Sequence, residues 1–389
     1  MEKIYFQNQQ PKDNNVYNEF LLEIIMEKGV LPSKLVVENR LIYSETSVVE
    51  VGQDTTEPSL GSKGWVLSRS IVRDSHKSLE DVLEKEKIDE FDLNSGSKLL
   101  MKGCVYVVKL NEFVKFQHGF EGIADEKSSV GRTGMNVKLL VDSPDVGCDA
   151  IPGDYKGSMY VEIVPHFNTR ISRGLKLNQV RVNNGRRILD ADELRLLHNK
   201  KPLLYNARED ALELDNKNLA GNSILMSIYM GSKLVALKAR KDAARVIDLG
   251  RDFSEERNKH NPDDFWEKVY LGSDGTITLM PDEFYIALTE EKVCIPPECC
   301  ATLDDYDNTW GRIQVHSAGF FNPGFGWPSG TQAILEIKVR DAPVCIRTGR
   351  KIAALRYEKM SSIPENIYKG GYQKQKLTPG KYFTELSEC

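Results

Sequence analysis

The sequence predicts a mainly β protein with a few short helices, arranged as two similar halves. Three observations support this fold class: several segments have strand-like composition, proline and glycine interrupt them at short intervals, and four short segments recur in order later in the chain. Many short strands with frequent turns favour a sandwich or jelly-roll-like domain over an α/β sheet. Apolar residues make up 40% of the 389 residues, so each half can bury a core.

Four segments have the alternation or the β-branched content of strands. They are residues 105–110, 159–164, 284–288 and 334–339. The clearest helix starts lie elsewhere. Ser78 precedes a helical pattern with Asp81 three residues on, and Asp190 precedes another with Glu193 at capping-box spacing.

A polar stretch, residues 199–222, follows the second predicted helix. We predict the domain boundary there, which gives an N-terminal domain of residues 1–200 and a C-terminal domain of residues 201–389. The charge run at 255–261 is predicted to be a surface loop.

The internal repeat consists of four segments separated from their counterparts by 174 to 180 positions. One or two such matches can arise by chance among strand-rich segments, whereas four in order favour a duplicated β domain. The paired residues are Tyr106 with Tyr285, Arg132 with Arg312, Glu162 with Glu336, and Arg181 with Arg356.

Composition excludes several classes of protein. Lys and Arg total 52 against 57 Asp and Glu, a balance that argues against a nucleic-acid binder. No stretch approaches the roughly 20 apolar residues that span a bilayer, and the first 15 residues lack the apolar core of a secretory signal. We therefore expect a cytoplasmic protein without membrane partners. The seven cysteines are irregularly spaced, which does not suggest a disulfide framework.

Two kinds of candidate functional residue stand out. Ser128, Ser129 and Arg132 place two hydroxyls and a guanidinium within five residues, which suits phosphate oxygens but also fits an ordinary turn. Glu162 and Glu336 each interrupt an apolar β segment. Either carboxylate points to solvent, or it projects into a cleft where partial desolvation raises its pKa and makes it a useful base.

Two glycine-rich segments also fit two interpretations each. Residues 318–326 combine glycine with phenylalanine and either face a planar ring or form a turn packed by aromatic side chains. Residues 368–375 either form a mobile tail that closes over a ligand or are a frayed terminus.

Metal-binding motifs are not found in the sequence. The signature of zinc deaminases is absent, as are H-E-x-x-H and Walker A motifs. The six histidines are scattered, although His316 follows a strand and adjoins Ser317.

These motifs, in this order, resemble the trimeric dUTPase superfamily, and more narrowly the long, two-domain 2′-deoxycytidine 5′-triphosphate (dCTP) deaminases of bacteria. The resemblance covers most of the chain, and the stretch HSAGFFNPGFG (316–326) and the tail YKGGYQKQKL (368–377) are its most specific parts. It implies a dUTPase-like β-clip, jelly-roll-like fold in each half, and sites built where units meet.

The resemblance also implies an active site shared between the halves. Ser128 and Arg132 of the first half would act with Glu336 of the second as catalytic residues. Glu162 would mark a second site, opposite residues 308–312, which are a degenerate copy of the Ser128–Arg132 motif. Whether the residues of one site come from one chain or from two stays open. The implied substrate-binding residues are Lys127, Ser129, His316, Ala318, Asn322, Tyr372 and Gln375.

The implied reaction is the zinc-independent deamination of dCTP to dUTP and ammonia. Glu336 would activate the water that attacks C4 of cytosine and then pass the proton to the ring and to the leaving amine. Mg²⁺ is expected with the triphosphate, the nucleotides dCTP and dUTP are the expected partners, and the family suggests homotrimers or multiples of them.

Three alternatives remain. A dUTPase holds its water with an Asp, but the matching positions here are Pro152 and Asn322, so deamination is favoured. Asn322 also departs from the Asp usual in long deaminases, which predicts reduced activity if that Asp orders water or an arginine. The second alternative is a bifunctional deaminase and dUTPase, and the third is a regulator that binds nucleotides without turning them over.

Overall fold

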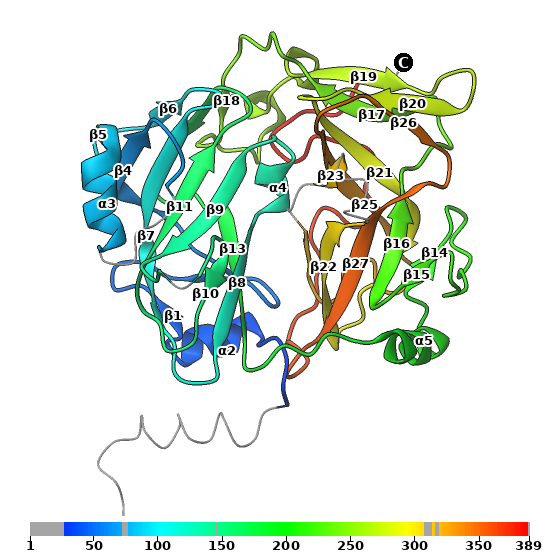
Figure 1. Cartoon of the computed structure of the whole chain (residues 1–389), viewed down its shortest axis with the longest axis horizontal. Coiled ribbons are helices and arrows are strands. Elements are labelled where there is room, and N and C mark those ends of the chain that lie inside the picture. Colours follow the sequence, from blue (N-terminus) through cyan, green and yellow to red (C-terminus); the bar gives the residue numbers. More distant parts are fainter. Residues whose placement is uncertain (1–26, 72–76, 145, 307–312, 316–318, 388–389) are drawn as a thin grey trace, which may run out of the picture.

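The computed structural model describes residues 27–71, 77–144, 146–306, 313–315 and 319–387. Strands β1–β13, which we call the first half, lie on the left of Figure 1. Strands β14–β27, the second half, lie on the right, except for β18, which lies on the left beside β6. The prediction of a mainly β protein with few short helices is confirmed. The β-clip description of each half and the boundary after residue 200 stay predictions.

The first half contains a six-stranded and a five-stranded sheet. The larger has the order β5-β4-β7-β11-β9, with β1 added to β7: β1 Ile42–Tyr43, β4 Leu60–Leu67, β5 Lys87–Asp92, β7 Val105–Lys115, β9 Asn136–Val141 and β11 Lys156–Val164. The smaller has the order β10-β8-β13-β3-β2: β2 Glu50–Val51, β3 Thr56–Glu57, β8 Glu121–Glu126, β10 Ala150–Ile151 and β13 Asn178–Asn183.

The second half has two sheets of the same sizes. The larger has the order β19-β17-β21-β25-β23, with β14 added to β21: β14 Leu204–Tyr205, β17 Leu234–Ala239, β19 Trp266–Tyr270, β21 Phe284–Val293, β23 Ile313–Val315 and β25 Thr331–Val339. The smaller has the order β15-β16-β27-β22-β24: β15 Leu219–Ala220, β16 Ser223–Ser227, β22 Cys299–Asp305, β24 Phe320–Phe321 and β27 Lys351–Lys359.

The strand orders of the two halves match one another when the smaller sheet of the second half is taken in the reverse direction, as β24-β22-β27-β16-β15. The repeat seen in the sequence therefore has a structural counterpart. Individual contacts repeat as well. Glu112 accepts hydrogen bonds from the backbone N–H and the hydroxyl of Ser59, and Glu291, 179 positions later, accepts the same two bonds from Ser227.

Both predicted helix starts are confirmed. α3 (Leu79–Glu86) begins after Ser78, whose hydroxyl accepts from the N–H of Asp81. α5 (Ala191–Lys200) begins with a complete capping box between Asp190 and Glu193. Two further helices, α2 (Ser33–Glu38) and α4 (Ser128–Gly131), are only one to two turns long and lay below what periodicity can detect.

The four predicted strands are also confirmed, and they correspond to β7, β11, β21 and β25. Each is longer than the predicted segment: β21, for example, continues beyond Leu288 to Val293. A register shift between Leu288 and Lys292 accompanies this extension, and the sequence pattern breaks there.

The second half also reaches across to cover the first. β18 (Ile247–Asp248) pairs in parallel with β12 (Thr169–Ile171), which in turn pairs with β6 (Lys98–Leu100). The equivalent pair in the second half is β20 (Thr276–Leu279) and β26 (Val344–Arg347). The ring of Phe265 packs edge-on against that of Phe167, with the two ring centres 5.4 Å apart. This contact joins the segment before β19 to the core of the first half.

The charge run at 255–261 is largely exposed, as predicted, and contains a short 3₁₀ turn, η1 (Glu256–Asn258), followed by η2 (Pro262–Asp264). His260 is the exception to this prediction, because it is buried. The backbone N–H of His260 donates to the carbonyl of Tyr382, and the carbonyl of His260 accepts from the N–H of Thr384. The run therefore anchors the end of the C-terminal tail.

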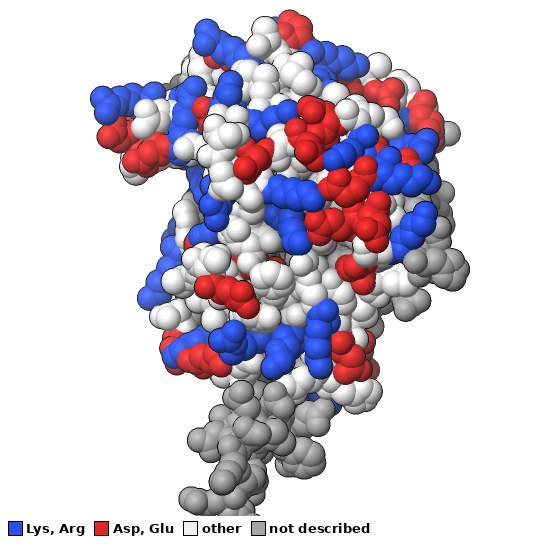
Figure 2. Space-filling view, turned by 90° about the vertical axis from the view of Figure 1, so that its left-hand side faces the viewer, with Lys and Arg blue, Asp and Glu red and all other residues white. Residues whose placement is uncertain are grey.

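Cationic and anionic side chains are interspersed on the face shown in Figure 2. Of the helices in the described part of the chain, none combines the length and the apolar character that crossing a membrane requires.

Candidate active site

The first half contributes the short helix α4 to the site. β8 ends at Glu126, and the chain turns at Lys127 into α4, which contains Ser128 and Ser129 and is followed directly by Arg132. In Figure 1, α4 faces the strands of the second half. The Lys127 ammonium forms an ion pair with Glu57 of β3. The motif is thus a helical turn that meets the other half of the molecule.

The second half contributes Glu336, which lies on β25 between β21 and β23. The residues from Ala333 to Ile337 are all buried, so both faces of β25 are covered at this point. The Glu336 side chain is 3% exposed. Of the two interpretations of this carboxylate, the solvent-facing one is therefore wrong.

The C-terminal tail is docked against the same region. The side chain of Gln373 accepts from the N–H of Gly326 at 2.9 Å and donates to the carbonyl of Gly324 at 2.9 Å. A Cβ on Gly324, which has φ +90°, would lie 2.6 Å from the Cβ of Ile367. Glycine at this position therefore permits the close approach of the tail. The frayed-terminus interpretation of residues 368–375 is therefore wrong.

Arg132 is where these parts meet. Its Nη2 donates to the amide oxygen of Gln375 at 2.8 Å, and its guanidinium carbon lies 4.0 Å from the centre of the Tyr372 ring. Gln375 is itself held, because its amide donates to the carbonyl of Gln332. Among the described residues, Nε and Nη1 of Arg132 and the hydroxyl of Tyr372 are buried and have no hydrogen-bond partner. Buried polar groups without partners are costly, so this arrangement suits a polar ligand.

A cavity of about 670 Å³ opens between these groups, within the range of small-molecule sites. The eight described residues that the sequence predicted for the site all line it, and all belong to this one chain. They are Lys127, Ser128, Ser129, Arg132, Asn322, Glu336, Tyr372 and Gln375. His316 and Ala318, also predicted for the site, lie outside the described residues.

Two lysines of the cavity were not predicted. Lys259 belongs to the charge run before β19, and Lys381 lies beyond the tail motif. Burial, and then the nearby charge of Lys127, lower the pKa of Lys381. Burial also raises the pKa of Tyr382, whose hydroxyl lies 3.5 Å from that of Ser129, to about 12. Three lysines thus line the cavity, Lys127, Lys259 and Lys381, of which Lys127 pairs with Glu57 and Lys259 with Glu256.

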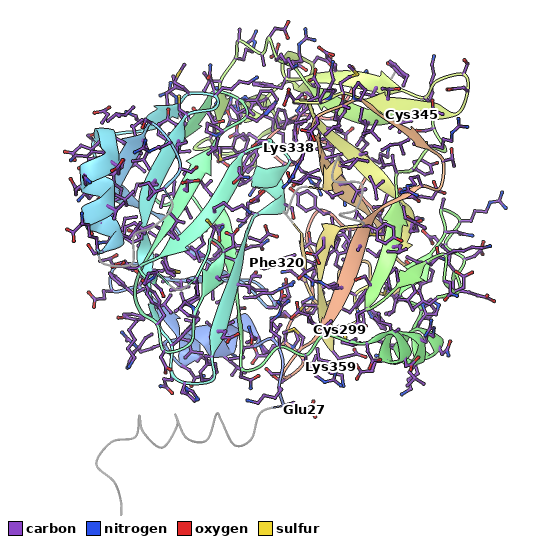
Figure 3. The ribbon with its side chains drawn as sticks, viewed as in Figure 1. Glu27, Cys299, Phe320, Lys338, Cys345 and Lys359 are labelled. Carbon is purple, nitrogen blue, oxygen red and sulfur yellow. The ribbon has the colours of Figure 1, made fainter. Side chains whose placement is uncertain are left out.

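Aromatic residues form another part of the wall. Phe320 and Phe321 of β24, together with Phe325, line the cavity beside Asn322. The Asn322 amide donates to the side-chain oxygen of Gln53, from the first half, at 3.1 Å. Figure 3 places Phe320 in the region between the two halves. Sequence analysis had identified this aromatic segment but left its environment open.

Glu162, the second-site candidate, lies in a separate cavity of about 370 Å³. It accepts a hydrogen bond from Ser70 at 2.9 Å, and burial raises its pKa. Lys338, from β25 of the second half, also lines this cavity. The segment predicted to face Glu162, residues 308–312, lies outside the described residues.

No cluster of three or more His, Cys, Asp or Glu side chains within the described ranges is placed to hold a metal ion. The site is instead a buried carboxylate, a stacked guanidinium and three lysines around one cavity between duplicated β halves. This combination suits an anionic ligand that carries a polar, planar group, and it offers groups suited to acid–base chemistry.

Comparison with known proteins assigns the chain to a family. Residues 27–186 match the N-terminal domain, and residues 190–383 the C-terminal domain, of 2′-deoxycytidine 5′-triphosphate deaminase. The chain therefore belongs to this deaminase family, which is a family of enzymes.

Individual relatives agree with this assignment. A "dCTP deaminase, dUMP-forming" of Corynebacterium efficiens is 32% identical over 138 residues, which cover 33% of this chain and 69% of that protein. A protein of the same description from Aquifex aeolicus is 29% identical over 102 residues, or 25% of this chain and about half (53%) of that protein. The crystal structure of 2′-deoxycytidine 5′-triphosphate deaminase from Agrobacterium tumefaciens aligns with a TM-score of 0.78 and 29% identity, covering 87% of this chain and 97% of that chain.

Proposed function

We propose that the protein deaminates dCTP hydrolytically, with Glu336 as the general base. The observation that carries this proposal is that the buried carboxylate of Glu336 and the Ser128–Arg132 turn line one cavity, although they come from different halves of the chain. The family assignment and the names of the relatives agree with this substrate.

The reaction replaces an amino group by oxygen. Glu336 takes a proton from a water molecule, whose oxygen forms a bond to C4 of the cytosine. Glu336 passes this proton to the ring nitrogen N3, which gives a tetrahedral intermediate with a hydroxyl on C4. The hydroxyl proton then moves, through Glu336, to the amine, so that the C4–N bond breaks, C4=O forms and ammonia leaves. General acid–base catalysis of this kind typically contributes about 10²–10⁴-fold to the rate.

Arg132 and Ser128 supply the polar surroundings of the reacting ring. The guanidinium is held flat by Tyr372 and Gln375, with Nε and Nη1 left for hydrogen bonds to the substrate. Fixed donors aimed at developing charge stabilise a transition state without reorganisation. Asn322 and the aromatic residues beside it would complete the wall around the nucleoside.

The triphosphate would bind beside the lysines that line the cavity. Lys127, Lys259 and Lys381 are positioned to neutralise its charge, with the hydroxyl of Ser129 as a further donor. Mg²⁺ would accompany the phosphates as a hard cation, and the carboxylates of Glu57 and Glu385, which line the cavity, are oxygen donors that fit it.

We propose dUTP, rather than dUMP, as the product. Hydrolysis of the phosphate chain would require a second activated water, and the residue at the relevant position of the wall is Asn322, a neutral amide. The competing product has support of its own, because the relatives from C. efficiens and A. aeolicus are described as dUMP-forming. A homotrimer, or a multiple of one, and a β-clip fold in each half complete the proposal.

A pair of matched variants tests the assignment of the base. Glu336→Gln keeps the shape of the side chain but removes the base, so we expect kcat for dCTP deamination to fall by about 10²-fold or more. Glu162→Gln, the control at the equivalent position of β11, should leave kcat within about twofold. Full turnover by the first variant, or inactivity of the second alone, would overturn the assignment.

A further inference from the structure

One arginine outside the cavity connects the two halves at the segment that forms the cavity wall. Arg181 lies on β13 of the first half and has no exposed surface. Its Nε donates to Asp54 at 2.5 Å, and Asp54 is equally buried. Its remaining hydrogen bonds cross to the second half.

The guanidinium binds two strands of the second half, β22 and β24, which pair with one another. Nη1 donates to the carbonyl of Ala301 at 2.9 Å and to the hydroxyl of Thr302 at 3.0 Å, both on β22. Nη2 donates to the carbonyl of Phe321 on β24 at 3.0 Å. The guanidinium carbon also lies 4.0 Å from the centre of the Phe320 ring. A planar fork can satisfy these acceptors together, whereas an ammonium cannot.

Arg181 is one of three side chains of the first half that hold this segment. The carboxylate of Asp125 accepts from the N–H of Gly319 at 2.6 Å, and Gln53, the neighbour of Asp54, accepts from the amide of Asn322. Four consecutive residues, 319–322, are thus fixed from the other half, and three of them line the cavity. Figure 3 shows Phe320 at this junction.

A buried ion pair is weak evidence for stability, because desolvation offsets its attraction. Well-packed apolar residues would hold the halves together as well. What they would not provide is directional bonding to two backbone carbonyls and a hydroxyl at the back of the cavity wall.

We propose that Arg181, held by Asp54, is a positioning residue that fixes β24 and Asn322 in the geometry needed for catalysis. It does not touch the substrate. Because the proposed function places the nucleoside against this wall, a displaced β24 would misalign the base and the reacting carbon. A misplacement of about 1 Å can cost about 10²-fold in rate.

Arg181→Lys, compared with Arg186→Lys, tests this role. Arg186 is also an arginine of the first half that binds a buried carboxylate of the second, but this carboxylate, Glu358, lies on β27 and not in residues 319–322. Both variants keep the charge and lose the fork, so both should lower the melting temperature. We expect kcat to fall about 10- to 100-fold in Arg181→Lys, with KM changed less than about threefold, and to stay within about twofold in Arg186→Lys.

Amide hydrogen exchange provides a readout that does not depend on turnover. Residues 319–325 should exchange about tenfold faster in Arg181→Lys and be unchanged in Arg186→Lys. Should Arg181→Lys fail to fold, Asp54→Asn, which keeps an acceptor for Nε, should show a smaller change of the same kind. A variant that folds with unchanged kcat and exchange would overturn the proposal.

The positioning role rests on the proposed function, but the two fail differently. If the wild-type protein makes no product from dCTP, the proposed function is wrong. If the wild-type protein is active and Arg181→Lys behaves like Arg186→Lys, only the positioning role is wrong.

Discussion

Glu336 and Glu162 occupy equivalent positions of β25 and β11, yet their surroundings differ. Glu336 is almost completely buried and faces the cavity that contains Arg132. Glu162 is half-buried and accepts a hydrogen bond from Ser70. Sequence analysis could not distinguish the environments of the two carboxylates, because each interrupts a similar apolar segment. Contacts from distant parts of the chain make the difference.

Arg132→Lys tests the guanidinium at the level of a single residue. Lysine keeps the charge but loses the planar fork and the stacking on Tyr372, so we expect kcat/KM for dCTP to fall by about 10²-fold. Steady-state kinetics measure this. Arg240→Lys, at a pair with Asp242 away from the cavity, is the control and should behave like the wild type. An Arg132→Lys variant with normal kcat/KM would remove the guanidinium from the proposed chemistry.

The tail and the strands that receive it form the site at the level of elements. Gln373 connects the tail to the turn that follows β24 through bonds to Gly324 and Gly326. Tyr372, which precedes Gln373, and Gln375, two residues after it, both contact Arg132. Without the bonds of Gln373, the tail would keep its contacts through Gln375 and through residues 382–384, but it would lose its contact with the turn that follows β24.

Gln373→Ala should therefore loosen the tail. We expect KM for dCTP to rise about tenfold, with a smaller fall in kcat, because the variant must order the tail when the substrate binds. Lys369→Ala, at an exposed position of the same tail, should leave both constants unchanged. Equal KM values for Gln373→Ala and the wild type would show that the tail does not contribute to binding.

The contact between Asp125 of β8 and the backbone of Gly319 predicts that the stability of the protein depends on pH. Burial, and then the charge of Glu126, raise the pKa of Asp125 well above its ordinary value. The folded protein therefore keeps this proton to higher pH than the unfolded chain does. Stability consequently falls as the pH rises from the unfolded pKa of about 4 towards the raised folded value.

Asp125→Asn removes this titration but keeps an acceptor for the N–H of Gly319. The wild type loses stability through Asp125 as the pH rises, and the variant does not. The melting temperature of the variant minus that of the wild type should therefore increase from about pH 5 to about pH 8. Thermal unfolding at several pH values measures the difference. A difference that stays constant, or that shrinks as the pH rises, would contradict the raised pKa.

Elements with a local cause were predictable. The four strands follow from alternation or β-branched content, and α3 and α5 follow from caps at Ser78 and Asp190. The one-turn helix α4 was not predictable, because four residues carry no periodicity. Its place in the site was nevertheless predicted from a family resemblance.

At the scale of the whole molecule, the site exists because the two halves pack together. The resemblance predicted eight of the described residues that line the cavity, and in the structure all eight belong to a single chain. Lys259, Lys381 and Arg181 were missed because their roles depend on contacts between distant segments. Lys259 reaches the cavity only because its neighbour His260 pairs with the tail, and no local pattern records that.

Identifying the products made from dCTP tests the central claim most directly. The purified protein is incubated with dCTP and Mg²⁺, and with dUTP in a parallel reaction, and nucleotides and ammonia are quantified. We predict equal amounts of dUTP and ammonia from dCTP, and unchanged dUTP in the parallel reaction. Formation of dUMP in both reactions would contradict the proposed product but not the deamination, whereas dCTP that stays intact while the protein is folded would contradict the central claim itself.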